Sequence, residues 1–197
     1  MDTETEASEQ VAMALFNKGV RLGALSRSQE AIDVYDQVVA RYGDRQEPAL
    51  ADLVATALFN KGVRLGALSR GQEEIDVYDQ VVARYGDRQE PALAEMVASA
   101  LGNKGWRQYE LGCYDASVAS SRAALVRKPS AALIRCNMAL ALLHLGEIAD
   151  AREAYAQAVG EISTPEDLNG ALHNLDAALE KRPDLPGARE IREMLGS

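Results

Sequence analysis

The chain has 197 residues, a formal net charge of −9 at pH 7, a charged fraction of 26% and a hydrophobic fraction of 47%. This composition is typical of a folded protein, and the acidic balance argues against a nucleic-acid partner, which would favour a basic face. The longest uninterrupted apolar run, residues 138–143, is too short to cross a bilayer, so we expect no membrane-embedded segment.

The N-terminal stretch 1–6 is acidic and lacks the basic and apolar regions of a secretory signal, and we expect it to be frayed. The two cysteines, Cys113 and Cys136, have no close spacing and no accompanying set of histidines. We interpret them as two buried thiols in a reducing compartment. These features favour a cytoplasmic protein.

Residues 11–53 recur almost unchanged as residues 54–96, with differences at only five of the 43 positions. Each copy contains two helical patterns, 14–25 and 29–42 in the first copy, separated by a short polar turn. A helix pair that recurs at a fixed period is the pattern of a stacked repeat array. We therefore look for function on a surface built by stacking and not in a single catalytic cleft.

In chain order, a first long helix is expected over residues 7–25. Ser26 and Ser69, each followed three residues later by glutamine, resemble capping boxes that open the second helix of each pair. Residues 43–48 end that helix, and Pro48 suits the first turn of the next one.

A third unit has diverged, but its Asn103-Lys104-Gly105 matches the same triplet in the first two units. The spacing from Gly19 to Gly62 and from Gly62 to Gly105 is 43 residues, whereas Gly105 to Ala139 is 34. The extra residues mostly continue the apolar stripe, so the first helices of the second and third pairs should be about two turns longer.

Further helices are expected over residues 130–145, 147–161, 164–182 and a last short segment ending near 195. The total is about ten helices without strands.

The 34-residue spacing and the residues around it resemble the tetratricopeptide repeat family. The first-helix pattern of that family is matched loosely by Leu15-x-x-Lys18-Gly19-x-x-Leu22 and its equivalents, and the second-helix pattern by Ala31/Tyr35 and Ala151/Tyr155. Pro129 ends the third unit where the family usually has proline, whereas Ser117 and Ser121 replace both members of the second-helix pattern.

The resemblance implies an all-α, right-handed superhelical solenoid of antiparallel helix pairs. The units are expected over about 7–46, 47–89, 90–129 and 130–163, with capping helices over 164–197. The resemblance also implies that one stripe of the first helices lines a concave groove that holds an extended peptide.

Asparagine occupies the same place on this stripe in all four units. An amide side chain offers an acceptor and donors, so a row of them could hold the backbone of a bound segment without reading its side chains. Aromatic and aliphatic residues nearby would supply apolar contacts. The candidate peptide-binding residues are Asn17, Val20, Phe16, Asn60, Val63, Phe59, Asn103, Trp106, Tyr109, Asn137, Leu140 and His144.

Alternatives remain for each of these features. The asparagines can be copies that face water or bond a neighbouring helix, and Trp106 can be packing between units. Lys18, Lys61 and Lys104 form a candidate carboxylate-binding row, although their stems can equally cover apolar surface while the ammonium groups reach solvent. His144 and His173 have no ligand spacing, so we expect no metal site.

No phosphate loop, nucleophile elbow or paired-carboxylate motif is found, so we predict no enzyme activity and no cofactor. The preferred function is a protein-interaction scaffold that binds an extended peptide or a segment of a partner protein in the concave groove. The alternative is a structural repeat module that self-associates as a homo-oligomer and has no peptide ligand. The near-perfect copy indicates either recent duplication or deliberate construction.

Overall fold

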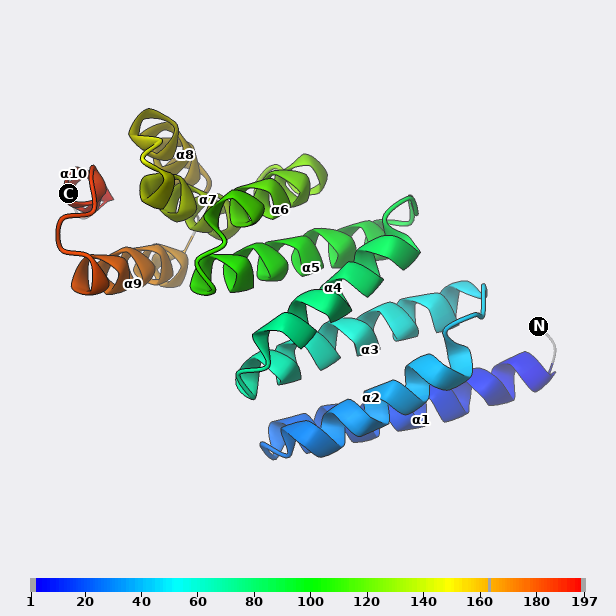
Figure 1. The fold of residues 1–197 in the computed structure, drawn as a ribbon. Helices are drawn as coiled ribbons and strands as arrows, with labels where there is room; N and C mark the ends of the chain where they lie inside the picture. The colour runs from blue at the N-terminus through cyan, green and yellow to red at the C-terminus, as the bar shows by residue number, and fades with distance from the viewer. Residues whose placement is uncertain (1–2, 163, 196–197) are drawn as a thin grey trace. The chain divides into compact units, whose positions relative to one another are not determined.

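The computed structural model describes residues 3–162 and 164–195, and across this part of the chain the backbone forms ten α-helices and no strand (Figure 1). The helices are α1 (Thr3–Ala24), α2 (Ser28–Tyr42), α3 (Pro48–Ala67), α4 (Gly71–Tyr85), α5 (Pro91–Glu110), α6 (Tyr114–Arg127), α7 (Ala132–Leu145), α8 (Ile148–Glu161), α9 (Pro165–Lys181) and α10 (Ala188–Leu195). The all-helical prediction is confirmed. Residues 3–6, which we expected to be frayed, are helical, and residues 1–2 lie outside the described part.

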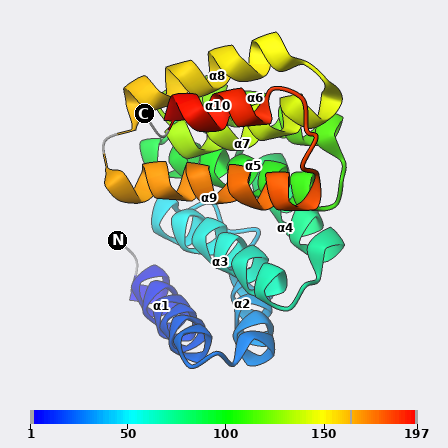
Figure 2. The same cartoon turned by 90° about the vertical axis from the view of Figure 1, so that its left-hand side faces the viewer.

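The chain divides into two compact units, residues 1–100 and 101–197, and the division falls within α5. In the first unit α1 packs on α2, α2 on α3, and α3 on α4. In the second unit α6 packs on α7, and α7 contacts both α8 and α9. Helix α10 closes this unit by packing on α9 and α8 (Figure 2).

The predicted difference in helix length is confirmed. Helices α3 and α5 have 20 residues each, whereas α7 has 14. Pro48 occupies the first turn of α3, where its missing N–H leaves no acceptor unpaired and its fixed φ suits the helix.

In the first two pairs the helices approach closely, because a glycine on the first helix faces a tyrosine on the second. A Cβ atom on Gly19 would lie 2.6 Å from Cε1 of Tyr35, and one on Gly62 would lie 2.5 Å from Cε1 of Tyr78. Both tyrosines are buried at 2% exposure or less. The glycine is therefore required by the ring that packs against it.

The turn inside each helix pair has a residue with left-handed backbone conformation at the equivalent position. Ser26 and Ser69 have φ of 59°, and the equivalent Gly112 and Gly146 have φ of 77° and 81°. In the first turn the N–H of Arg27 donates to the carbonyl of Leu22 at 2.9 Å, and the N–H of Ser26 donates to the carbonyl of Gly23 at 3.1 Å. This pair of bonds is a Schellman motif, and it recurs in the other three turns.

The capping-box prediction at these serines was wrong. Ser26 and Ser69 end the first helices, and Arg27 and Arg70 stand at the N-cap positions of α2 and α4 without a side-chain cap hydrogen bond. A serine in the left-handed conformation cannot also serve as an N-cap, which requires an extended backbone.

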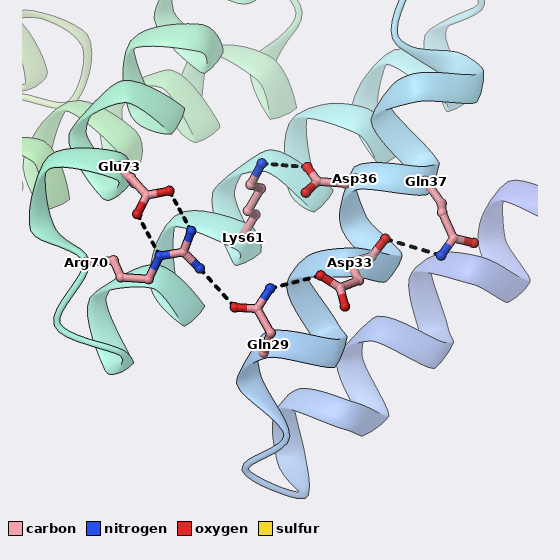
Figure 3. Close-up of polar contacts among 7 residues, drawn as sticks. All are labelled: Gln29, Asp33, Asp36, Gln37, Lys61, Arg70 and Glu73. Carbon is pink, nitrogen blue, oxygen red and sulfur yellow. Dashed lines mark hydrogen bonds and ion pairs between the residues drawn. The ribbon is translucent and has the colours of Figure 1, made fainter.

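A polar seam joins the first two repeats. The ammonium of Lys61 lies 2.5 Å from a carboxylate oxygen of Asp36 (Figure 3). The guanidinium of Arg70 donates to Oε1 of Gln29 at 2.9 Å, and Arg64 donates to the carbonyl of Gly23 at 3.2 Å. Each donor belongs to the second repeat and each acceptor to the first, so these contacts fix how the two pairs stack.

The prediction that both thiols are buried was wrong for Cys113. Cys136 is buried, and burial raises its pKa to about 12, whereas Cys113 is exposed at the start of α6. Cys113 follows the left-handed Gly112, so the same surface turn that joins α5 to α6 carries its side chain into solvent.

Candidate functional site

The second unit contains a cavity of about 600 Å³ between the ends of α5 and α7, the start of α6 and the second half of α9. Helices α5 and α7 are first helices of their pairs, which the resemblance assigns to a groove, whereas α9 belongs to the region expected to cap the array. The lining residues are Trp106, Tyr109, Glu110, Tyr114, His144, His173, Asn174, Ala177, Ala178, Lys181 and Arg182.

One wall of the cavity is a cluster of four rings. Trp106 stacks on Tyr109 with ring centroids 5.3 Å apart, and His144 stacks on Tyr114 at 4.4 Å. Tyr109 links the two stacks, because its ring meets His144 edge-on at 5.4 Å and its hydroxyl lies 3.2 Å from Nε2 of that histidine. The cluster therefore offers a partly buried aromatic wall made of two stacked ring pairs.

The other side of the cavity carries positive charge. Lys181 and Arg182 are exposed at the end of α9, and Nε of Arg182 lies 3.8 Å from a carboxylate oxygen of Asp184, which is outside the lining. Glu110, the only carboxylate in the lining, is paired with Arg107 at 2.7 Å. The net field at the rim therefore favours an anionic group on a ligand.

Burial shifts the pKa values of His144 and Tyr109 in the cluster. Burial, with a smaller contribution from the charge of Arg182, lowers the pKa of His144 from its ordinary value of 6.5, so the imidazole is neutral near pH 7. Burial raises the pKa of Tyr109 to about 12, so its hydroxyl stays protonated. The pair can thus share one hydrogen bond without carrying charge.

The four asparagines of the predicted row differ in their surroundings. The side chain of Asn60 is hydrogen bonded to Tyr35 of the preceding pair, and Oδ1 of Asn137 accepts a bond from Nδ2 of Asn174 at 3.2 Å. Asn103 also has an interaction partner, and Asn17 is exposed on α1. Asn60 and Asn137 join neighbouring helices, which matches the alternative reading of these residues.

Several apolar candidates are packed into the protein. Leu140 is fully buried in the core of the second unit, so it offers no surface to a ligand. Phe16 and Phe59 lie against Tyr35 and Tyr78, with ring centroids 6.1 Å and 5.9 Å apart. Their aromatic faces therefore support the helix pairs.

The remaining apolar candidates keep some surface. Val20 is exposed and Val63 is partly buried, on α1 and α3 respectively.

Two of the three lysines in the candidate carboxylate-binding row already have partners within the protein. Lys61 is paired with Asp36, Lys104 has an interaction partner, and Lys18 is exposed. The row therefore serves contacts within the protein at two of its three positions.

The structure brings three of the candidate peptide-binding residues, Trp106, Tyr109 and His144, together at the cavity. Sequence reasoning missed the contribution of α9, namely His173, Asn174, Lys181 and Arg182. Helix α9 lies outside the recognisable repeat period, so no register related these residues to the stripe. Among the described residues, no group of three or more histidine, cysteine or acidic side chains could hold a metal ion.

Comparison with known proteins confirms the resemblance. Residues 103–167 match the family model described as tetratricopeptide repeat (TPR). No curated protein matches the chain. Of the described helices, none is both long and apolar enough to span a membrane.

Three solved structures show the fold. Residues 41 to the end of MamA from Desulfovibrio magneticus RS-1 are 18% identical, with a TM-score of 0.66 over 93% of this chain and 92% of that one. A protein of Podosopora anserina with nearly identical TPR-like repeats is 17% identical, with a TM-score of 0.65 over 95% and 94%. YrrB, described as a TPR protein with an unusual peptide-binding site, is 16% identical, with a TM-score of 0.54 over 98% of both chains. At these identities the likeness establishes a tetratricopeptide-type fold.

Proposed function

We propose that this chain is a non-catalytic, cytoplasmic adaptor that binds an extended segment of a partner protein along the first helices of its second unit. One side chain of that segment enters the cavity beside Trp106. The observation that carries the proposal is the cavity, in which a wall of four rings faces a rim of positive charge.

The cavity chemistry indicates which segment would bind. The face formed by Trp106 and Tyr109 suits a flat or branched apolar side chain, since aromatic anchors dominate the energy of such contacts. Lys181 and Arg182 would attract an acidic side chain a few residues away in the segment. We therefore propose a partner segment that places an apolar residue close to an acidic one.

The TPR-type fold supports this role, because arrays of helix pairs use extended surfaces to bind partners. One of the solved structures with this fold is described as having a peptide-binding site. In the present chain the proposed contacts lie on rigid helices and need no loop to order, which keeps the cost of binding low.

The proposal is tested with an array of short random peptides, read first by binding and then by the fluorescence of Trp106, the only tryptophan in the chain. Peptides that pair an apolar residue with an acidic one should be selected, and their titration should shift the Trp106 emission. Tyr109→Ala should weaken the selected peptides by about tenfold or more, as truncation of an anchor residue does.

Charge is tested separately. Lys181→Glu should weaken acidic peptides several-fold, mainly through association rate, and the loss should shrink as salt is added. Arg122→Glu is the matched control, because Arg122 is exposed on α6 outside the cavity and carries the same charge. Selection of peptides without an acidic residue, or equal loss in both charge variants, would contradict the proposed recognition.

A further inference from the structure

The outer face of α1 is an apolar and charged surface that nothing in the first unit covers. Val11 is 47% exposed and Met13 is 49% exposed, and Leu25 just beyond the helix is 66% exposed. Two adjoining hollows follow this face, one from Glu6 to Asn17 and the other from Ala14 to Leu25.

The same face of α3 shows what such a surface does in this fold. Val54 and Ala57, the equivalents of Val11 and Ala14, are fully buried under the preceding helix pair. There Lys61 pairs with Asp36 at 2.5 Å (Figure 3). Asn60 bonds Tyr35 of the preceding pair. Residues 54–67 of α3 differ from residues 11–24 of α1 at only one position, so nearly the same sequence forms there a surface on which another helix packs.

On α1 the corresponding polar groups are left open. Lys18 and Arg21, the equivalents of Lys61 and Arg64, have exposed side chains, and the charge of Lys18 acts on Glu30 of the following helix as a minor cause of the lowered pKa of that carboxyl. Lys61 and Arg64 of α3 contact the adjacent repeat, whereas α1 presents the same donors to solvent.

Charge along α1 identifies the helix that fits. Glu6 and Glu9 line the hollow over the first half of the face, whereas Lys18 and Arg21 line the hollow over the second half. A second α1 laid antiparallel would place each acidic half against a basic half. Pairing centred between residues 13 and 14 sets Glu6 opposite Arg21, with Met13 and Ala14 of both chains at the centre.

We infer that two copies of this chain pair through their α1 helices, antiparallel and about a two-fold axis. The same patch meets itself in this arrangement, as a closed two-fold interface requires. The proposal concerns a surface on the first unit and is independent of the peptide cavity in the second.

The size of the face bounds the strength of the pair. A helix of 22 residues is about 33 Å long, and a stripe about 10 Å wide gives on the order of 700 Å² for the two chains together. Stable interfaces bury about 1,200–2,000 Å². The dimer should therefore be weak and concentration-dependent, with dissociation in the micromolar range or above.

Sedimentation equilibrium across a concentration series tests the proposal. The native chain should pass from monomer to dimer, and added salt should favour the monomer. Two variants, Lys18→Glu with Arg21→Glu and Glu6→Lys with Glu9→Lys, should each lower the association constant at least tenfold. A mixture of the two should restore a heterodimer, because every charge then meets its opposite.

The control carries the same charge change away from α1, as Arg122→Glu with Arg189→Glu, and should dimerise like the native chain. Circular dichroism checks that each variant keeps its helices, which glutamate and lysine both favour. A native chain that stays monomeric at every concentration overturns the inference. So does a dimer that both charge variants leave intact, since its interface would then lie elsewhere, or a mixture that stays monomeric.

Discussion

Replacement of Gly62 by alanine tests whether the close approach of α3 and α4 depends on the missing side chain. The added Cβ would lie 2.5 Å from Cε1 and 2.7 Å from Cζ of Tyr78. Carbon atoms in contact normally lie about 3.5–4.0 Å apart, so the ring or the helix must move by about 1 Å. Tyr78 is fully buried.

Overpacking of this kind costs about 1–3 kcal/mol, and the gain in helix propensity from glycine to alanine returns about 1 kcal/mol. We therefore expect Gly62→Ala to lower the free energy of unfolding by up to about 2 kcal/mol. For a unit of this size each 1 kcal/mol corresponds to about 4–8 °C in Tm. Urea and thermal unfolding followed by circular dichroism measure both quantities.

Gly160 provides the matched control, because a Cβ there meets no atom within 4 Å. Gly160→Ala should leave Tm unchanged or raise it. In a chain that also carries Tyr78→Ala, the penalty of Gly62→Ala should vanish, since the clashing ring is gone. The reasoning is refuted if Gly62→Ala is as stable as Gly160→Ala, or if its penalty persists without the ring.

Three further outcomes are expected from the turns, the core and the ion pairs. Ser69→Gly should raise the free energy of unfolding by up to about 1 kcal/mol in urea titrations, because glycine adopts the left-handed turn without strain; unchanged stability would contradict this. Ser117→Ala should stabilise the chain by about 1–2 kcal/mol, since the buried Ser117 hydroxyl has no hydrogen-bond partner in the described structure, and a loss of stability would show that it has one in solution. The hydrogen bond from Arg45 holds the pKa of Glu47 at about 2, so its contribution to stability is present above about pH 4.5 and is lost as the pH falls towards 2. Arg45→Gln should return that pKa towards 4.5 in an NMR titration and leave the equivalent Glu90 at about 2; equal values for both glutamates would refute the assignment.

Much of the fold could be predicted because the repeat makes each local signal appear several times. Helical spacing located the pairs, and the 43- and 34-residue periods predicted which first helices are longer. The turn at Ser26 was misread because a serine followed three residues later by glutamine also occurs in capping boxes. Its alignment with Gly112 and Gly146 is the signal for a left-handed residue.

Sequence reasoning could predict only those site residues that lie on helices of the repeat. Trp106 and His144 lie on one stripe across two units, Tyr109 was expected near it, and all three line one cavity. Lys181 and Arg182 lie on a helix without a repeat partner, so nothing in the spacing related them to that stripe. The role of Asn60 depends on a tyrosine in another helix pair, and only tertiary packing shows that its amide is already used.

The seam between the first two repeats has a consequence for how such a chain can lengthen. Its donors lie on one copy and its acceptors on the other, yet both copies carry both sets, because Lys18 repeats Lys61 and Asp79 repeats Asp36. An additional copy inserted between the two would find matching groups on each side without any new substitution. Unequal recombination within the duplicated gene segment would therefore yield arrays of different length that are already compatible at every junction.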